Sequence, residues 1–209
     1  AWVSEIGPLK IPNMSELEEN EVTREMVDKS MVKCPCLATS DEMVKLIELT
    51  KQQGDSLGGV VEVRVYNPPI GLGEPCFNKM EALLAHAMLS IPATKGFEIG
   101  SGFTCSSQMG SQHNDVFTKS DDNIKPLTNN AGGTLGGITS GETIKFRVAF
   151  KPPSTISKPQ QTVNVNGDAV TLCAEGRHDP SIVHRAIPIV EAMTSLTILD
   201  QALIQRYRN

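Results

Sequence analysis

Aromatic residues and clustered positive charge are both scarce in this chain of 209 residues. Aromatic side chains make up 4% of the sequence, and the formal net charge is −5 at pH 7. No block of lysine and arginine concentrates a basic field, so the composition argues against nucleic-acid binding. A small anionic ligand would therefore depend on a few cations placed close together.

The signatures of several other protein classes are also missing. No run of residues approaches the roughly 18 apolar positions of a membrane span, and no secretory signal opens the chain. The five cysteines are odd in number and scattered, which favours reduced thiols in a cytoplasmic setting. Cys34-Pro35-Cys36 lacks the spacer of a zinc motif, and Walker A, nucleophile-elbow, HExxH and EF-hand patterns are absent. We therefore expect no metal site.

The first part of the chain predicts one strand followed by helices. Ala1 to Ser4 has the composition of a strand interior. A charged helix is expected within residues 15–31, and a second helix begins after the capping candidates Thr39 and Ser40 and ends at Gly54. We treat residues 15–53 as a helical unit within a single domain, and residues 59–209 as half of a sandwich that carries the ligand-binding segments.

The rest of the chain mixes strands and helices. Alternating apolar residues predict strands at 61–65 and 143–150, and a helix at 79–90 precedes a strand at 94–99. Asn166-Gly167 predicts a hairpin. The last helix is expected from Pro188, in its first turn, to Arg206. Residues 104–131 look irregular, and the order of all elements predicts an α+β fold.

Gly176-Arg177-His178-Asp179-Pro180 is the densest group of ionisable side chains. On an extended segment Arg177 and Asp179 lie on the same face, which favours this pair over His178 for chemistry. Upstream, Lys151-Pro152-Pro153-Ser154-Thr155 joins a lysine to hydroxyl groups that suit a phosphate. A surface turn and a capped strand end with a solvated lysine remain the alternatives.

Two further features carry less information by themselves. The glycine-rich run from Gly132 to Gly141 allows close backbone approach to a ligand, yet by itself a structural turn explains it as well. His86, His113 and His184 lack the spacing of a catalytic pair.

Several segments together resemble the C-terminal portion of the chorismate synthase family, in the same order and with similar spacing. They are Gly54–Gly59, Gly71–Pro75, Ser90–Gly100, Gly110-Ser111 with Asn114-Asp115, Gly132–Glu142, Lys151–Thr155 and Gly176–Met193. Pro92-Ala93-Thr94 and Lys151-Pro152-Pro153 are more similar to fungal and other eukaryotic members. Ser181–His184 departs from the cysteine-containing sequence usual in the family.

The resemblance implies a β-α-β sandwich, here lacking its N-terminal portion, and a cytoplasmic homotetramer. The implied enzyme is a lyase of the shikimate pathway of aromatic amino acid biosynthesis. It would convert 5-enolpyruvylshikimate 3-phosphate to chorismate and phosphate by a 1,4-anti elimination that needs reduced FMN. The resemblance leaves open whether NADPH reduces the flavin on the protein itself.

The resemblance also assigns residue roles. Asp179 is implied to act catalytically, in proton transfer near the flavin. FMN contacts are implied for Pro92, Ala93, Gly136, Lys151, Pro152, Pro153, Ser154, Thr155 and Arg177. The family's catalytic histidines and most substrate-binding arginines belong to the N-terminal portion, so we expect the 209-residue chain alone to be inactive. A non-catalytic fragment or module that binds an anionic ligand is the alternative.

Overall fold

The computed structural model describes residues 1–12, 22–120 and 123–208. Its largest sheet has five strands in the hydrogen-bonded order β2-β1-β3-β9-β4. β1 (Trp2–Ile6) pairs antiparallel with β2 (Leu9–Lys10). The expected strand at the start of the chain is confirmed by β1.

Three predicted strands of this sheet are confirmed. They are β3 (Gly59–Val65), β4 (Thr94–Ile99) and β9 (Ile144–Phe150). In β9 every second residue is buried, as the alternating sequence predicts. In β3 the polar Glu62 is buried as well as Val61 and Val63, so this strand is covered more fully than simple alternation implies.

Contacts between Cα atoms divide the chain into two compact units. One unit contains Ala1, Glu62–Val148 and Pro188–Asn209, and the other contains Trp2–Val61 and Ala149–Ile187. Strands β3 and β9 and the last helix contribute residues to both units. The prediction of a single domain stays a prediction.

The first described helices differ from the expected ones at their beginnings. α2 (Arg24–Asp28) starts at Thr23, whose hydroxyl accepts a hydrogen bond from the Met26 N–H, while residues 15–21 of the expected helix lie outside the described residues. α3 (Leu37–Gln52) begins at Cys36, so Thr39 and Ser40 were wrong as caps. Both are buried inside the first turn, because the helix packs that face inward. The C-terminal cap is confirmed: Gly54 has φ +70° just beyond the helix.

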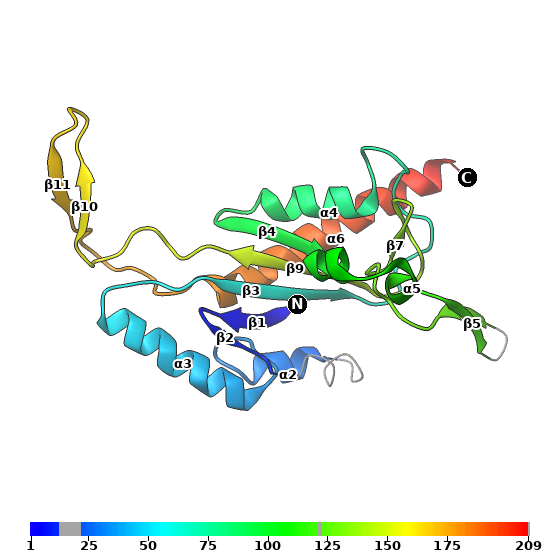
Figure 1. Cartoon of the computed structure of the whole chain (residues 1–209), viewed down its shortest axis with the longest axis horizontal. Coiled ribbons are helices and arrows are strands. Elements are labelled where there is room, and N and C mark those ends of the chain that lie inside the picture. Colours follow the sequence, from blue (N-terminus) through cyan, green and yellow to red (C-terminus); the bar gives the residue numbers. More distant parts are fainter. Residues whose placement is uncertain (13–21, 121–122, 209) are drawn as a thin grey trace. The chain divides into compact units, whose positions relative to one another are not determined.

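α4 (Met80–Leu89) confirms the helix expected at 79–90, and in Figure 1 it lies along β4. Short elements occupy the segment 104–131, so its description as irregular was incomplete. They are the 3₁₀ helix η1 (Gly102–Ser107), α5 (Gly110–His113), β5 (Phe117–Ser120) and β6 (Asn123–Pro126).

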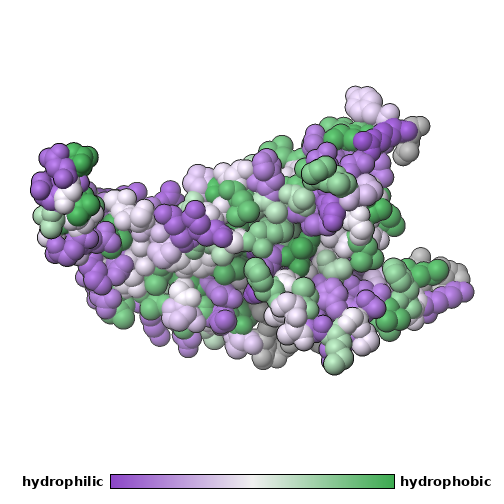
Figure 2. All heavy atoms as spheres, turned by 45° about the horizontal axis from the view of Figure 1, so that its top comes forward, coloured by the Kyte–Doolittle hydropathy of each residue, from purple (hydrophilic) through white to green (hydrophobic). Residues whose placement is uncertain are grey.

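Two further small hairpins follow along the chain. β7 (Thr134–Leu135) and β8 (Ile138–Thr139) form the glycine-rich run, and β10 (Gln160–Val163) and β11 (Ala169–Leu172) form the hairpin expected around Asn166-Gly167. The β10–β11 hairpin is exposed throughout and carries apolar side chains among polar ones, visible at the left of Figure 2.

The last helix, α6 (Val183–Arg208), begins five residues before the expected start at Pro188. The backbone N–H groups of Arg185 and Ala186 already bond to the Ile182 carbonyl. Buried Val183, Ile187 and Val190 form an apolar stripe that crosses the proline. Packing of this stripe outweighs the cost of an interior proline, which sequence reasoning had taken as a start signal.

α6 is also the one described helix whose length and composition would suit a membrane span. Such a property is shared by core helices of water-soluble folds, and α6 buries residues in the core. Leu196, Leu199 and Leu203 are nevertheless exposed. The apolar surface that this chain leaves uncovered therefore includes one face of α6.

The approach of β1 to β3 depends on Gly59. A Cβ atom at this position would lie 2.1 Å from the Glu5 carbonyl oxygen, whereas a Cβ at Gly110 would meet nothing within 4 Å. We expect Gly59→Ala to lower the free energy of unfolding by about 1–3 kcal/mol through backbone displacement. Gly110→Ala, the matched control, should change it by less than about 0.5 kcal/mol. Urea unfolding with equal midpoints for the two variants would contradict this account.

Candidate functional site

One pocket of about 220 Å³ brings together three segments that are distant in the sequence. All of its lining residues belong to the compact unit that contains Ala149–Ile187. We call it the loop pocket, and it is lined by Lys51, Gly54, Asp55, Thr155, Ile156, Ser157, Gly176, Arg177, His178, Asp179 and Pro180. Gly176–Pro180 and Thr155, the last residue of the Lys151–Thr155 segment, therefore contribute to one site.

Backbone contacts hold the three segments together. The Leu57 N–H donates to the Pro180 carbonyl at 2.7 Å, and the Lys158 N–H donates to the Gly54 carbonyl at 3.0 Å. The Ser56 hydroxyl donates to the Pro153 carbonyl at 2.6 Å. A Cβ at Gly58 would lie 2.3 Å from the Phe150 carbonyl oxygen, so glycine is required for this close approach.

Asp179 is held through both of its carboxylate oxygens. Arg177 Nη1 donates to Oδ1 at 3.1 Å, and Arg185 Nη1 donates to Oδ2 at 2.5 Å. The predicted arginine–aspartate pair at residues 177 and 179 is therefore present, and a second guanidinium joins it. Sequence reasoning missed Arg185, which lies six residues beyond Asp179 and reaches it because α6 begins before Pro188.

A second carboxylate of the loop pocket, Asp55, is paired with Lys158 at 3.0 Å. The side-chain hydrogen bond from Lys158, aided by the backbone N–H of Ser56, lowers the pKa of Asp55 below its ordinary value. Asp55 is thus ionised at neutral pH. Lys158, Arg177 and Arg185 pair with the two carboxylates, and Lys51 also lines the pocket. Four cations thus outnumber two carboxylates, and the local charge is positive although the whole chain is acidic.

The hairpin β10–β11 joins two walls of the loop pocket along the chain. Thr155–Ser157 precedes the hairpin and Gly176–Pro180 follows it. At its base the Cys173 thiol donates to the Ser157 carbonyl, with 2.9 Å between sulfur and oxygen. This contact and the β10–β11 ladder fix the spacing between the two walls.

Of the Lys151–Thr155 segment, Thr155 alone lines the loop pocket. Lys151, Pro152 and Ser154 are exposed, and Pro153 receives the bond from Ser56. Lys51, Asp55 and Ser157 line the pocket although no role was predicted for them. Gly54–Gly59 is one of the segments that resemble the family, and this resemblance was the signal in the sequence for this wall.

Gly136, Pro92 and Ala93 belong to the other compact unit. Gly136 and Gly137 form the two-residue turn of β7–β8 with φ +61° and +94°, and the space beside Gly136 is open. Pro92 and Ala93 form a turn in which the Thr94 N–H bonds to the Ile91 carbonyl at 3.3 Å. Ala93 has φ +69°, a conformation that costs about 1–3 kcal/mol and is often found at ligand sites.

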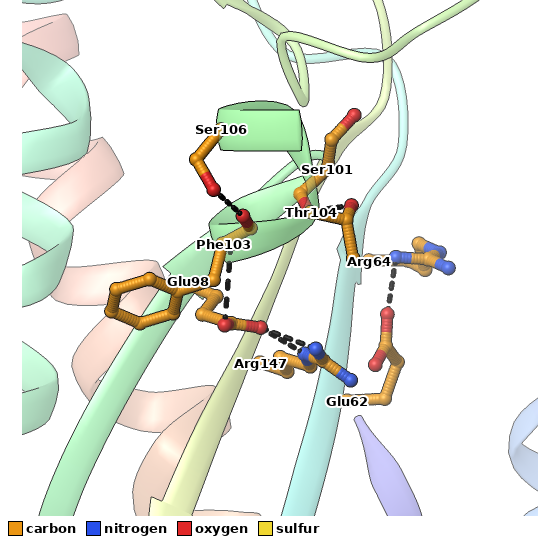
Figure 3. A network of polar contacts seen from close by, with 8 residues as sticks. All are labelled: Glu62, Arg64, Glu98, Ser101, Phe103, Thr104, Ser106 and Arg147. Carbon is orange, nitrogen blue, oxygen red and sulfur yellow. Dashed lines mark hydrogen bonds and ion pairs between the residues drawn. The ribbon is translucent and has the colours of Figure 1, made fainter. Parts of the chain in front are cut away.

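A separate polar cluster on β3, β4 and β9 is shown in Figure 3. Glu98 accepts from Arg147 at 2.5 Å and from the Phe103 N–H at 3.3 Å, and Arg64 donates to Glu62 at 2.6 Å. Each arginine here faces a glutamate. The cluster therefore ties η1 to the sheet and is a poorer anion site than the loop pocket.

The first turn of α6 adds a titratable group beside Asp179. Burial lowers the pKa of His184 below its ordinary value, and the neighbouring charge of Arg185 lowers it further, against the opposing effect of Asp179. Its Nδ1 is buried and has no hydrogen-bond partner within the described part of the chain. His184 is therefore neutral at physiological pH.

The site and the fold define an α+β protein with a small, positively charged loop pocket suited to an anionic group. The family model described as chorismate synthase matches residues 1–203. Chorismate synthases of Synechococcus sp. strain WH7803 and Methylacidiphilum infernorum are each 51% identical, over 207 and 206 residues, or 99% of this chain and 56% and 55% of those proteins. The chain belongs to the chorismate synthase family.

A solved structure supports the same conclusion for the fold. A chain described as "Crystal Structure of Chorismate Synthase" superposes with a TM-score of 0.76 at 30% identity, and the match covers 98% of this chain and 56% of that one. The α+β class is thereby confirmed. The chain spans about half the length of the curated relatives that it matches. The greater likeness to fungal members stays a prediction.

The lowered pKa of His184 has a measurable consequence. Since the unfolded chain takes up a proton at this histidine more readily than the folded chain, stability should fall as the pH drops through about 6.5 and below, and be regained above it. We expect His184→Gln to lose less of its unfolding free energy than the unchanged chain between pH 7.5 and pH 5. Parallel denaturant titrations at both pH values test this, and equal losses would contradict it.

Proposed function

We propose that these residues serve a chorismate synthase, which converts 5-enolpyruvylshikimate 3-phosphate to chorismate and phosphate with reduced FMN. Family membership supports this function. The observation that carries it is the loop pocket, in which the Arg177–Asp179 pair, Thr155 and Ser157 line one positively charged cavity.

The residues of the pocket fit part of a flavin nucleotide. Hydroxyl groups, a lysine and a guanidinium are the donors that bind phosphate oxygens. At about 220 Å³ the pocket is smaller than the roughly 300–1,000 Å³ of sites that enclose a whole cofactor. We infer that it holds an anionic portion of the ligand and that other surfaces of the complete site cover the ring.

The remaining cofactor residues are assigned to the flavin as part of the same proposal. Lys151 would approach the phosphate from outside the pocket, and Pro152, Pro153 and Ser154 would fix the loop that carries it. Gly136 and the strained turn at Pro92-Ala93 offer backbone that a flat ligand can approach closely.

In the proposed reaction a C–O bond to phosphate and a C–H bond across the ring break, and a new double bond forms. Reduced FMN, when bound, supplies electron density that assists phosphate departure. The protein must receive the proton at a fixed acceptor. Asp179 is our candidate, because its carboxylate lines the pocket and the family likeness implies a part in proton transfer for this residue.

We further propose a cytoplasmic homotetramer without a nucleic-acid or membrane partner. The exposed leucines of α6 are consistent with additional protein surface covering this helix. NADPH as the reductant of bound flavin can be tested directly, by supplying NADPH and FMN without another reductant and without oxygen.

Asp179→Asn tests the catalytic proposal. The test protein is a hybrid in which this chain replaces the 207 matched residues of the Synechococcus relative. We expect Asp179→Asn to lower chorismate formation by about 100-fold or more while FMN still binds, because the amide cannot accept the proton. Asp168→Asn, on the exposed β10–β11 turn, is the matched control and should retain activity.

Two outcomes would decide against the proposal. Unimpaired turnover of the Asp179→Asn hybrid would remove Asp179 from the mechanism. A folded hybrid that binds FMN or phosphate without forming chorismate would favour the non-catalytic binding module instead.

The 209-residue chain alone should bind FMN at least about tenfold more weakly than the hybrid and form no chorismate. The reason is that the loop pocket can enclose only part of the cofactor. Flavin fluorescence titration and product chromatography measure both properties. Chorismate formation by the chain alone would show that its own residues suffice.

A further inference from the structure

Arg185 contacts the Asp179 carboxylate without being one of the residues that line the loop pocket. Arg177 and Asp179 both line it. The two guanidinium groups thus approach one carboxylate from different sides. Arg177 can contact a ligand in the pocket, whereas Arg185 contacts Asp179 from outside the lining.

The two arginines also differ in how firmly they are placed. Arg185 lies in the first turn of α6, where its N–H bonds to the Ile182 carbonyl and its neighbours Val183 and Ala186 are buried. Arg177 follows Gly176, which has φ +113°, in a segment without helix or strand. Its side chain is 85% exposed. The contact from Arg177 is therefore the weaker and more easily exchanged of the two.

We propose that Arg185 is a positioning residue, which holds Asp179 at Oδ2 so that Arg177 can leave Oδ1 and bind an anionic group of the ligand. This inference rests on the proposed function of the loop pocket. Without Arg185 the charge of Asp179 would have Arg177 as its remaining arginine partner. Arg177 would then have to give up that contact before it could bind a phosphate.

The same pocket offers a matched control for loss of charge. Lys158 pairs with Asp55 at 3.0 Å, and it too stands outside the lining while its carboxylate partner stands inside. Lys158→Gln and Arg185→Gln each remove one positive charge from a carboxylate of the pocket. Within the described part of the chain Asp55 pairs with Lys158 and Arg177 pairs with Asp179, so Lys158→Gln should leave Arg177 free to act.

The experiment measures FMN and inorganic phosphate affinities of the hybrid defined above, with thermal unfolding as a check of folding. We expect Arg185→Gln to weaken FMN binding by about tenfold, in line with loss of a charge-assisted hydrogen bond. Lys158→Gln and the conservative Arg185→Lys should each weaken it by less than about threefold. In an Asp179→Asn background, Arg185→Gln should also have an effect below about threefold, because the carboxylate it holds is gone.

Each outcome bears on the proposal. Equal losses of FMN affinity in Arg185→Gln and Lys158→Gln would show that Arg185 contributes only its positive charge. An undiminished loss in the Asp179→Asn background would show that Arg185 does not act through Asp179. Either result overturns the inference while FMN binding still supports the proposed function. Binding of phosphate but not FMN would refute the proposed cofactor, and the same variants would then test Arg185 by their affinity for phosphate. A hybrid that binds neither ligand overturns both proposals.

Discussion

The candidate site depends on the close approach of three backbone segments, which hydrogen bonds between main-chain groups hold together. Residues 54–59 lie between the chain that follows β9 and the chain that precedes α6, and hydrogen bonds from Leu57 and Lys158 fasten them on both sides. Gly58 leaves no space for a Cβ atom at this point. The main-chain contacts thus bring the charged residues to the pocket, and the ion pairs between those residues then orient their side chains.

Each carboxylate of the pocket is paired with one or two cations. Asp55 has a lysine partner that lowers its pKa, and Asp179 shares its two oxygens between two arginines. Cations in excess over carboxylates give an acidic protein a local attraction for anions. Such an arrangement agrees with the absence of a lysine and arginine block from the sequence, because a phosphate needs few cations when they are well placed.

Local sequence pattern predicted the parts of the structure that are governed by local rules. The alternation of apolar residues predicted the buried face of β9, and Asn166-Gly167 predicted the hairpin. The two-residue spacing predicted that Arg177 lies on the same face as Asp179. The start of α6 was missed because burial of Val183 and Ile187 outweighs the proline signal. Arg185 was missed together with the start of α6, and Lys51 and Asp55 were missed because their roles arise from tertiary contacts. The Lys158–Asp55 pair, for example, spans 103 positions in the sequence.

The β10–β11 hairpin has a consequence for how this site can vary between relatives. At the base of the hairpin the Cys173 thiol donates to the Ser157 carbonyl. The two pocket walls, Thr155–Ser157 and Gly176–Pro180, lie at this base and not at the tip of the hairpin. Insertions or deletions at the tip, around Asn166, would therefore change the length of the arm without shifting the register of either wall. The length of the β10–β11 hairpin can therefore differ between relatives while the loops that line the pocket keep their geometry.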